Sequence, residues 1–326
     1  MSWPWFTEAI TIAVLSLLVF AVMFGPLERA FAARPGQRAW RAGSGVDLAF
    51  FFGQYLLWSA LALLVLDQVR GGLGDVVPAG WRRGAGSWPL AVQVAVAVVL
   101  GDLLVYGWHR ACHAVPVLWR FHAVHHTAES LDWLAAHREH PLDGVTTQLA
   151  QNLPAMALGL SLGEVGALVV FRGMWGAFIH SNVRLDVGWL RFALGAPVLH
   201  HYHHARDVAR TANYANLAPW IDVVFGTYQR PTGPETYALG VAEPAPRGYL
   251  ALLVWPFDSR LRRSLRASGG SGSGGAEQIG SRGVDQGSGG YRPAANPSRA
   301  ARRRALPLPP IGSSATVQVA HRRGSL

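Results

Sequence analysis

The chain has 326 residues, of which half are hydrophobic and 15% are charged, and its formal net charge at pH 7 is +10. This composition excludes an average soluble domain and fits one membrane core with appended segments. Many arginines flank apolar stretches, so the positive charge indicates membrane orientation and contact with anionic lipid, and we expect no nucleic-acid partner. The single cysteine, Cys112, excludes an internal disulfide and a paired-thiolate metal or redox site.

Three apolar stretches in the first third of the chain predict transmembrane helices. Residues 9–25 carry no charge and can cross the roughly 30 Å hydrocarbon layer. A cleaved signal peptide is the alternative for this stretch, but no basic residue precedes it and it is longer than a usual signal-peptide core. Residues 46–66 and 88–108 are the second and third predicted spans, and Asp102 lies near the end of the third. A carboxylate at that depth is unfavourable in lipid, so we expect Asp102 to face protein or a metal site.

The arginines between the first two spans predict which side of the membrane each end faces. This loop carries Arg29, Arg34, Arg38 and Arg41, which places it in the cytoplasm by the positive-inside bias. The third span then ends on the cytoplasmic side, where the histidines begin. We therefore expect the inner membrane of a bacterium, with the histidine-rich regions on the cytoplasmic side.

Two further segments complete the predicted organisation. The apolar stretch from Thr146 to Phe178 is broken by Pro154 and glycines, and it predicts two short helices that enter and leave the membrane on one face. After about Ser268 the chain is rich in Gly, Ser, Pro and Arg, which predicts a disordered basic tail.

Twelve of the 13 histidines lie between residues 109 and 204, in a pattern typical of a metal site. The three sets are HRACH (109–113), HAVHH (122–126) and HHYHH (200–204). Spacings of i, i+3 and i+4 let one helical turn present several ring nitrogens to a shared centre, and imidazole is a common ligand of iron, copper and zinc. Eight side chains in these sets are enough for two metal ions: His109, His113, His122, His125, His126, His200, His203 and His204.

These ordered sets resemble the histidine boxes of the fatty acid hydroxylase and sterol desaturase superfamily. Further segments look like family signatures in family order: LWRFHAVHH (118–126), RxHPL (138–142), FIHSN (178–182), Asn213-Tyr214 and the DxxFGTY that ends at Tyr228. The resemblance covers about residues 45–230 and is specific because so many motifs occur in order. It implies that the eight box histidines are metal ligands.

The resemblance also sorts the remaining histidines. His180 and His140 occupy family histidine positions outside the boxes, so we expect them to be additional ligands or to support the ligands. His137 and His201 stand where the family has no expected histidine, and members often have Arg at the place of His201. Six carboxylates are candidates for orienting ligand imidazoles, although each could equally be a solvated or helix-capping group: Asp102, Glu129, Asp132, Asp143, Asp207 and Asp222.

By resemblance, the function is oxidation of a lipid C–H bond by dioxygen at a pair of iron ions. We expect hydroxylation of a fatty acyl or sterol-like substrate, with desaturation at the same site as the alternative. The chain has no dinucleotide fingerprint and no iron–sulfur motif, so electrons would come from a ferredoxin or a cytochrome with its reductase. A zinc-binding protein and a membrane metal transporter are interpretations of another class; a transporter would place its ligands at mid-depth, whereas these cluster at span ends.

The predicted fold is an all-α integral membrane bundle with a cytoplasmic helical cap that holds a dimetal site. The predicted parts are an N-terminal span and loop (1–45), a catalytic membrane domain (46–258) and the basic tail (259–326). The sequence leaves open the substrate and the position oxidised, the redox partner, the oligomeric state and the role of the tail.

Overall fold

The structure, a computed structural model, describes residues 4–185, 188–206, 212–231 and 233–258. Within these ranges every regular element is a helix, as predicted. The longer helices are α1 (Pro4–Ala30), α2 (Ser44–Gly53), α3 (Ser59–Val76), α5 (Leu90–Ala114), α6 (Pro116–His126), α7 (Pro141–Ala157) and α8 (Leu162–His180). The short ones are η1 (Gln54–Trp58), α4 (Ala79–Gly86), η2 (Trp133–His137), η3 (Gly188–Phe192), α9 (Pro197–His203), α10 (Trp220–Val224), α11 (Tyr249–Val254) and η4 (Trp255–Phe257).

The chain divides into two units, Met1–Gly274 and Gly275–Leu326. The predicted basic tail (259–326) lies outside the described residues, as does Asp207. The boundary predicted between 1–45 and 46–258 stays a prediction. In the described part, α1 packs with η1 and α8 through an aromatic core that includes Phe20, Phe24 and Phe51.

Among the described residues, three helices are long and apolar enough to cross a membrane: Phe6–Ala30, Ser44–Val76 and Leu90–Ala114. The second is longer than the predicted 46–66, because Asp67 and Arg70 end the apolar stretch without ending the helix; they pair at i, i+3 on its surface. The second span also contains the π-helical turn η1, where the Ser59 hydroxyl donates to the Gln54 carbonyl. The protein is therefore an integral membrane protein.

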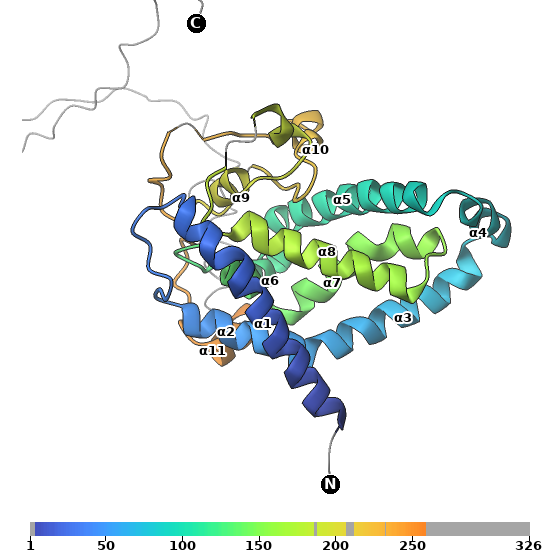
Figure 1. Cartoon of the computed structure of the whole chain (residues 1–326), viewed down its shortest axis with the longest axis horizontal. Coiled ribbons are helices and arrows are strands. Elements are labelled where there is room, and N and C mark those ends of the chain that lie inside the picture. Colours follow the sequence, from blue (N-terminus) through green and yellow to red (C-terminus); the bar gives the residue numbers. More distant parts are fainter. Residues whose placement is uncertain (1–3, 186–187, 207–211, 232, 259–326) are drawn as a thin grey trace, which may run out of the picture. The chain divides into compact units, whose positions relative to one another are not determined.

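The two predicted helices are present as α7 and α8, which contact each other, and their entry into the membrane from one face stays a prediction. Helix α8 begins with a capping box, in which Ser161 and Glu164 bond each other's backbone N–H groups. Helix α7 packs closely against α5, and also contacts α3 and α8. In Figure 1, α3, α5, α7 and α8 run in the same general direction, α4 lies at one end of them, and α6 and α9 lie at the other.

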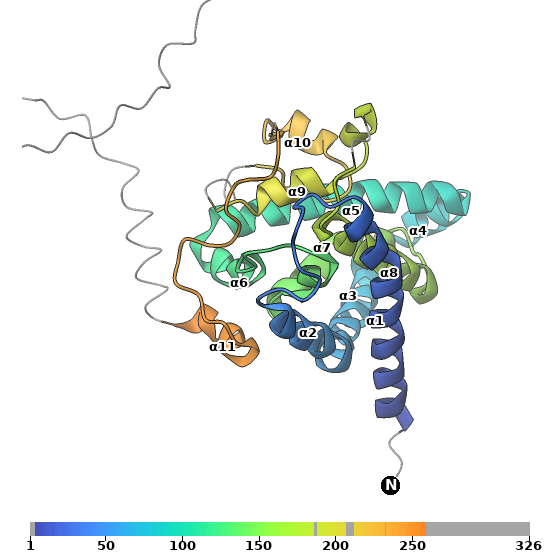
Figure 2. The same cartoon turned by 60° about the vertical axis from the view of Figure 1, so that its left-hand side comes forward.

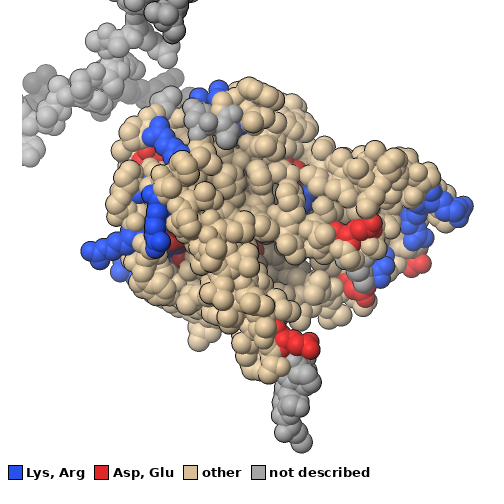
Figure 3. Space-filling model, in the orientation of Figure 1, with Lys and Arg blue, Asp and Glu red and all other residues tan. Residues whose placement is uncertain are grey.

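Arginine side chains lie at both ends of these long helices. Figure 3 shows arginines at the end that carries α4 and at the opposite end, with a largely uncharged surface between them on the face shown. Such a band is expected where helices meet lipid. Figure 2 also shows α6 on the side of the helices away from α4. The histidine boxes lie on α6, on α9 and at the end of α5.

A buried ion-pair network fixes the loop after α1 to this end of the bundle. Arg41 binds both oxygens of Asp132 at 2.7 and 2.6 Å and contacts Asp47 at 2.7 Å. Asp47 also accepts from Nε of Arg138 at 2.5 Å. Arg41 therefore stands inside the protein, whereas the sequence suggested only a positively charged loop.

Candidate metal centre

Four helix ends carry the histidines to one place. His109 and His113 lie in the last turns of α5, and Pro116 begins α6 after a single extended residue, so the second box folds back beside the first. Pro197 begins α9, which carries the third box. His180 is the last residue of α8. Prolines at the first turn suit these short helices because the missing N–H would have had no helical partner there.

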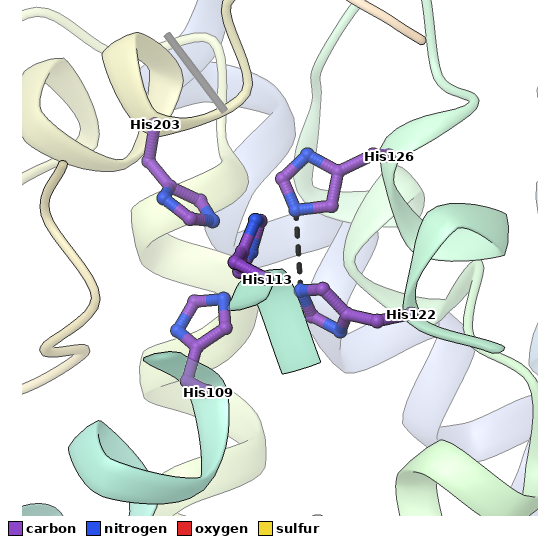
Figure 4. Close-up of side chains that lie close together, drawn as sticks. All are labelled: His109, His113, His122, His126 and His203. Carbon is purple, nitrogen blue, oxygen red and sulfur yellow. Dashed lines mark hydrogen bonds between the residues drawn. The ribbon is translucent and has the colours of Figure 1, made fainter. Parts of the chain in front are cut away.

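The histidines form two buried clusters. Cluster A consists of His109, His113, His122, His126 and His203, and in Figure 4 these five rings converge on a common space. Cluster B consists of His125, His180, His200 and His204. In each cluster, one nitrogen of every ring lies within 4.8 Å of the corresponding nitrogens of the others.

The second and third boxes are each divided between the clusters by helix geometry. Each residue of a helix turns about 100°, so i and i+4 point nearly the same way while i+3 is rotated from i+4 by about 100°. His122 and His126 accordingly enter cluster A and His125 enters cluster B. In the third box, His200 and His204 enter cluster B and His203 enters cluster A.

Hydrogen bonds on the outer nitrogens orient five of the rings. The Nδ1 atoms of His109, His125, His180 and His203 lie 2.7, 3.1, 2.7 and 2.7 Å from the carbonyl oxygens of Tyr214, Arg138, Gly176 and Ala212. His122 Nδ1 lies 2.8 Å from the Asp143 carboxylate. A carbonyl can only accept, so Nδ1 carries the hydrogen and the Nε2 lone pair faces the cluster. The sequence named Asp143 among six carboxylates, but it could not reveal the backbone acceptors.

The inner nitrogens then face one another in a way that only a cation makes favourable. His125 and His180 both carry their hydrogen on Nδ1, yet their Nε2 atoms lie 3.1 Å apart. Two lone pairs repel at this distance unless a positive ion lies between them. Ligands bound at about 2.1 Å and at right angles to one another would be about 3.0 Å apart. The Nε2 atoms of His180 and His200 are 3.0 Å apart, and those of His200 and His204 are 3.1 Å apart.

Other ring nitrogens in the clusters are buried without a hydrogen-bond partner among the described residues. They are His109 Nε2, both nitrogens of His113, His126 Nδ1, His200 Nδ1, His203 Nε2 and His204 Nδ1. Buried polar atoms normally have partners. For His109 and His203, Nδ1 is bonded to a carbonyl and the unpartnered atom is the Nε2 on the cluster side, which fits a ligand of a metal ion. The residues present therefore suit two nitrogen-ligated ions, one in each cluster.

Burial keeps these imidazoles neutral, which a metal ligand requires. Burial, reinforced by neighbouring histidines, lowers the pKa of His125, His126, His200 and His204 well below the ordinary value of 6.5. Burial likewise lowers the pKa of His203 to about 3. A proton therefore does not occupy the lone pairs at neutral pH.

The profile of the fatty acid hydroxylase family matches residues 94–227, the range that holds both clusters. An ornithine lipid hydroxylase from Rhizobium tropici is 32% identical over 183 residues, which are 55% of this chain and 54% of that protein. Alkylglycerol monooxygenase from Homo sapiens is 28% identical over 42% of this chain and 31% of that protein. Delta(7)-sterol 5(6)-desaturase from Gibberella zeae is 28% identical over 45% of this chain and 41% of that protein.

Residues 94–227 thus form a fatty acid hydroxylase domain, and the chain's relatives belong to the lipid hydroxylases, monooxygenases and sterol desaturases by name. The chain spans about half of the ornithine lipid hydroxylase and less of the other two relatives. No solved structure matches it.

The superfamily signatures outside the boxes support the ligands. Asn213 adopts a left-handed conformation with φ 56°, and its side chain bonds the backbone at Leu199 and Gln229. The next residue, Tyr214, offers its carbonyl to His109, while its own N–H and that of Ala215 donate to Asp222. Asp222, from the DxxFGTY signature, thus holds the backbone that orients His109 of cluster A.

The structure places the other predicted residues as follows. His180 enters cluster B, whereas His140 lies outside both clusters: it caps α7 by accepting from the Leu142 N–H, and its Nε2 contacts the Leu253 carbonyl at 3.1 Å. His137 lies 3.0 Å from the Gln54 side-chain oxygen in the second span. His137 and His140 thus have structural partners outside the clusters.

Two further candidate carboxylates, Asp102 and Asp132, bind backbone N–H groups or an arginine. Asp102 is fully buried and accepts from the N–H groups of Leu217 and Ala218, so it faces protein as expected. Asp132 binds Arg41 and caps η2 by accepting from the Ala135 N–H. Among the described candidates, Asp143 alone contacts a cluster histidine directly.

Proposed function

We propose that the protein is a membrane-bound, dioxygen-dependent enzyme that hydroxylates a lipid C–H bond at a pair of iron ions. Cluster A would hold one ion and cluster B the other. The metal site would face the cytoplasm, and the inner membrane of a bacterium is the expected location. The observation that carries the proposal is the contact between the His125 and His180 lone pairs at 3.1 Å, which is favourable only around a cation.

The choice of iron rests on the donor set and the relatives. Imidazole nitrogen suits iron, zinc and copper alike. The relatives' names include hydroxylases, monooxygenases and desaturases. These reactions oxidise carbon, which iron can support and zinc, having no redox chemistry, cannot. Iron bound at the two clusters would supply dioxygen activation, which no side chain can perform.

The protein's own residues hold and orient the histidine rings and shield them from water. Five Nδ1 hydrogen bonds fix the rings of His109, His122, His125, His180 and His203. The Trp119 ring lies 5.0 Å from that of His113 and 5.3 Å from that of His126, and the Tyr214 ring lies 5.3 Å from that of His113. These aromatic walls exclude water from the cluster A side of the centre.

The overall hydroxylation would consume one dioxygen, two electrons and two protons, and would yield one hydroxylated lipid and one water. The C–H bond breaks, one oxygen atom enters the C–O–H group, and the other leaves as water. The electrons would come from a separate carrier, such as a ferredoxin or a cytochrome with its reductase.

Hydroxylation is favoured over desaturation because the ornithine lipid hydroxylase is 32% identical to this chain. The match also covers a larger share of that protein than of the monooxygenase or the desaturase described above. Desaturation is the second candidate, since sterol desaturases also match. It would release two waters and remove two hydrogens from the lipid, so the products differ in mass.

The test combines metal analysis with lipid mass spectrometry in cells that express the wild type or His125→Ala. We expect about two irons per chain and a lipid heavier by about 16 mass units, both reduced in the variant. A lipid lighter by about two mass units would identify a desaturase instead. Bound zinc with no change in lipid, or release of metal across the membrane, would overturn the proposal in favour of a zinc protein or a transporter.

His140→Asn is the matched control, because asparagine also caps helices and His140 lies outside both clusters. Product formation and metal content should stay close to those of the wild type.

A further inference from the structure

His201 is buried among the ligands but is bonded differently from all of them. It lies between His200 of cluster B and His203 of cluster A in sequence, and 1% of its surface is exposed. Its Nδ1 lies 2.9 Å from the Glu235 carboxylate and its Nε2 lies 3.2 Å from the His180 carbonyl oxygen. Its two ring nitrogens thus contact oxygen atoms, one of the Glu235 carboxylate and one of the His180 backbone.

The His180 carbonyl is a backbone acceptor at the end of a helix. His180 is the last residue of α8, and the last four carbonyls of a helix have no partner within it. His201 therefore ties the end of α8 to α9. On the opposite side of this connection, the Nε2 atoms of His180 and His200 meet at 3.0 Å inside cluster B.

Glu235 links the same ring to the loop after the first span. Arg34 Nε lies 3.5 Å from the Glu235 carboxylate, and the Arg34 side chain donates to the Tyr237 carbonyl at 2.9 Å. The Arg34 backbone N–H donates to Asn182, two residues beyond His180. The Glu235 carboxylate thus fixes His201 from the side remote from the metal cluster.

We propose that the Glu235–His201 pair is a positioning device specific to cluster B, which sets the distance between the His180 and His200 ligand nitrogens by holding the His180 carbonyl. The pair touches no metal ligand nitrogen and acts only through the backbone of His180. This inference rests on the proposed dimetal centre. Cluster A has its own counterpart, the Asp143 carboxylate on His122, so disturbing the Glu235–His201 pair should leave cluster A intact.

The test measures metal affinity, without any assay of lipid product, in two backgrounds of the full-length protein in detergent. In a His203→Ala background the remaining ion would lie in cluster B, and in a His200→Ala background it would lie in cluster A. Each background is titrated with Co²⁺ in competition with a chelator, with and without His201→Leu. Co²⁺ bound to imidazole also absorbs visible light, and the spectrum reports ligand geometry.

We expect His201→Leu to weaken Co²⁺ binding about 10- to 100-fold in the cluster B background and to change its spectrum, as is typical when the partner of a ligand is removed. In the cluster A background the affinity should change less than about threefold by the same reasoning. Equal weakening in both backgrounds would mean that His201 only stabilises the fold, and no weakening in either would also overturn the proposal. Glu235→Gln keeps an acceptor for His201, so it should restore most of the affinity that Glu235→Leu loses.

The two proposals fail in different ways. If the wild-type chain binds no metal, the dimetal centre itself is wrong. If the wild type binds two ions and His201→Leu affects both backgrounds alike, the positioning role alone is wrong.

Discussion

His126 of cluster A and His204 of cluster B stack face to face, with ring centroids 4.2 Å apart and planes inclined by 24°. This stacked pair joins the two clusters directly. Each ring restrains the orientation of the other, so the two proposed metal sites are in direct contact through this pair.

The stacked pair predicts which ligand losses affect both ions. His126→Ala would remove a cluster A ligand and also leave the ring of His204 without its support, so metal content should fall from about two ions to below about one. His113 stacks with no cluster B ring in the contacts described, so His113→Ala should retain about one ion. Metal analysis of both purified variants checks this, and equal loss in the two would contradict it.

The position of His140 predicts that it is not a metal ligand. Its two ring nitrogens are engaged by the Leu142 N–H and the Leu253 carbonyl. His140→Ala should lower stability by about 1 kcal/mol, the usual effect of losing a helix cap. The metal content should stay at the wild-type value. A loss of one ion would show that His140 is a metal ligand after all.

The buried carboxylate Asp47 should contribute far more to stability than an exposed one. Asp47 is 0% exposed and pairs with both Arg41 and Arg138. Asp47→Ala would leave two buried guanidinium groups without this partner, and we expect a loss of about 3–5 kcal/mol, seen as a lower melting temperature in detergent. The displaced Arg138 backbone should also weaken the orientation of His125, whose Nδ1 bonds the Arg138 carbonyl.

Asp67→Ala is the matched control for Asp47→Ala. Asp67 also pairs with an arginine, Arg70, but both side chains are exposed on α3. Its removal should change stability by less than about 1 kcal/mol. Similar melting temperatures for the two variants would show that the buried network is not a stabilising element.

The metal-free protein should lose stability in mild acid. Burial lowers the pKa of His125, His126, His200 and His204 well below 6.5, and that of His203 to about 3. Below pH 6.5 the unfolded chain binds protons at these side chains while the folded chain does not, so the free energy of unfolding falls as pH falls. Each histidine lowers the free energy of unfolding by up to about 1.4 kcal/mol for every pH unit below 6.5, until the pH reaches the pKa of that histidine in the folded protein.

The measurement is the melting temperature of chelator-treated protein between about pH 7 and about pH 4. The His203→Ala variant should show a shallower dependence than the wild type, because it lacks one of these groups. A flat profile in the wild type would show that the cluster histidines are protonated in the folded protein.

The sequence by itself determined the helical class, the spans and the identity of the box histidines. Apolar length decides whether a segment can cross a membrane, and a spacing of i, i+3 and i+4 decides which side chains share a helix face, so both can be predicted locally. The two helices between Thr146 and Phe178 were predictable for the same reason, and α7 and α8 confirm that they form.

Helix geometry separates the i+3 histidine of a box from the other two, but only the tertiary structure decided which cluster each of them enters. The choice of cluster for His125 and His203 depends on the directions in which α6 and α9 meet α5 and α8, and no local spacing encodes a crossing angle. Backbone carbonyls carry no sequence signal, so the acceptors at Tyr214, Arg138, Gly176 and Ala212 could not be foreseen. The same holds for Glu235, which reaches His201 from 34 residues away because the chain folds back over α9.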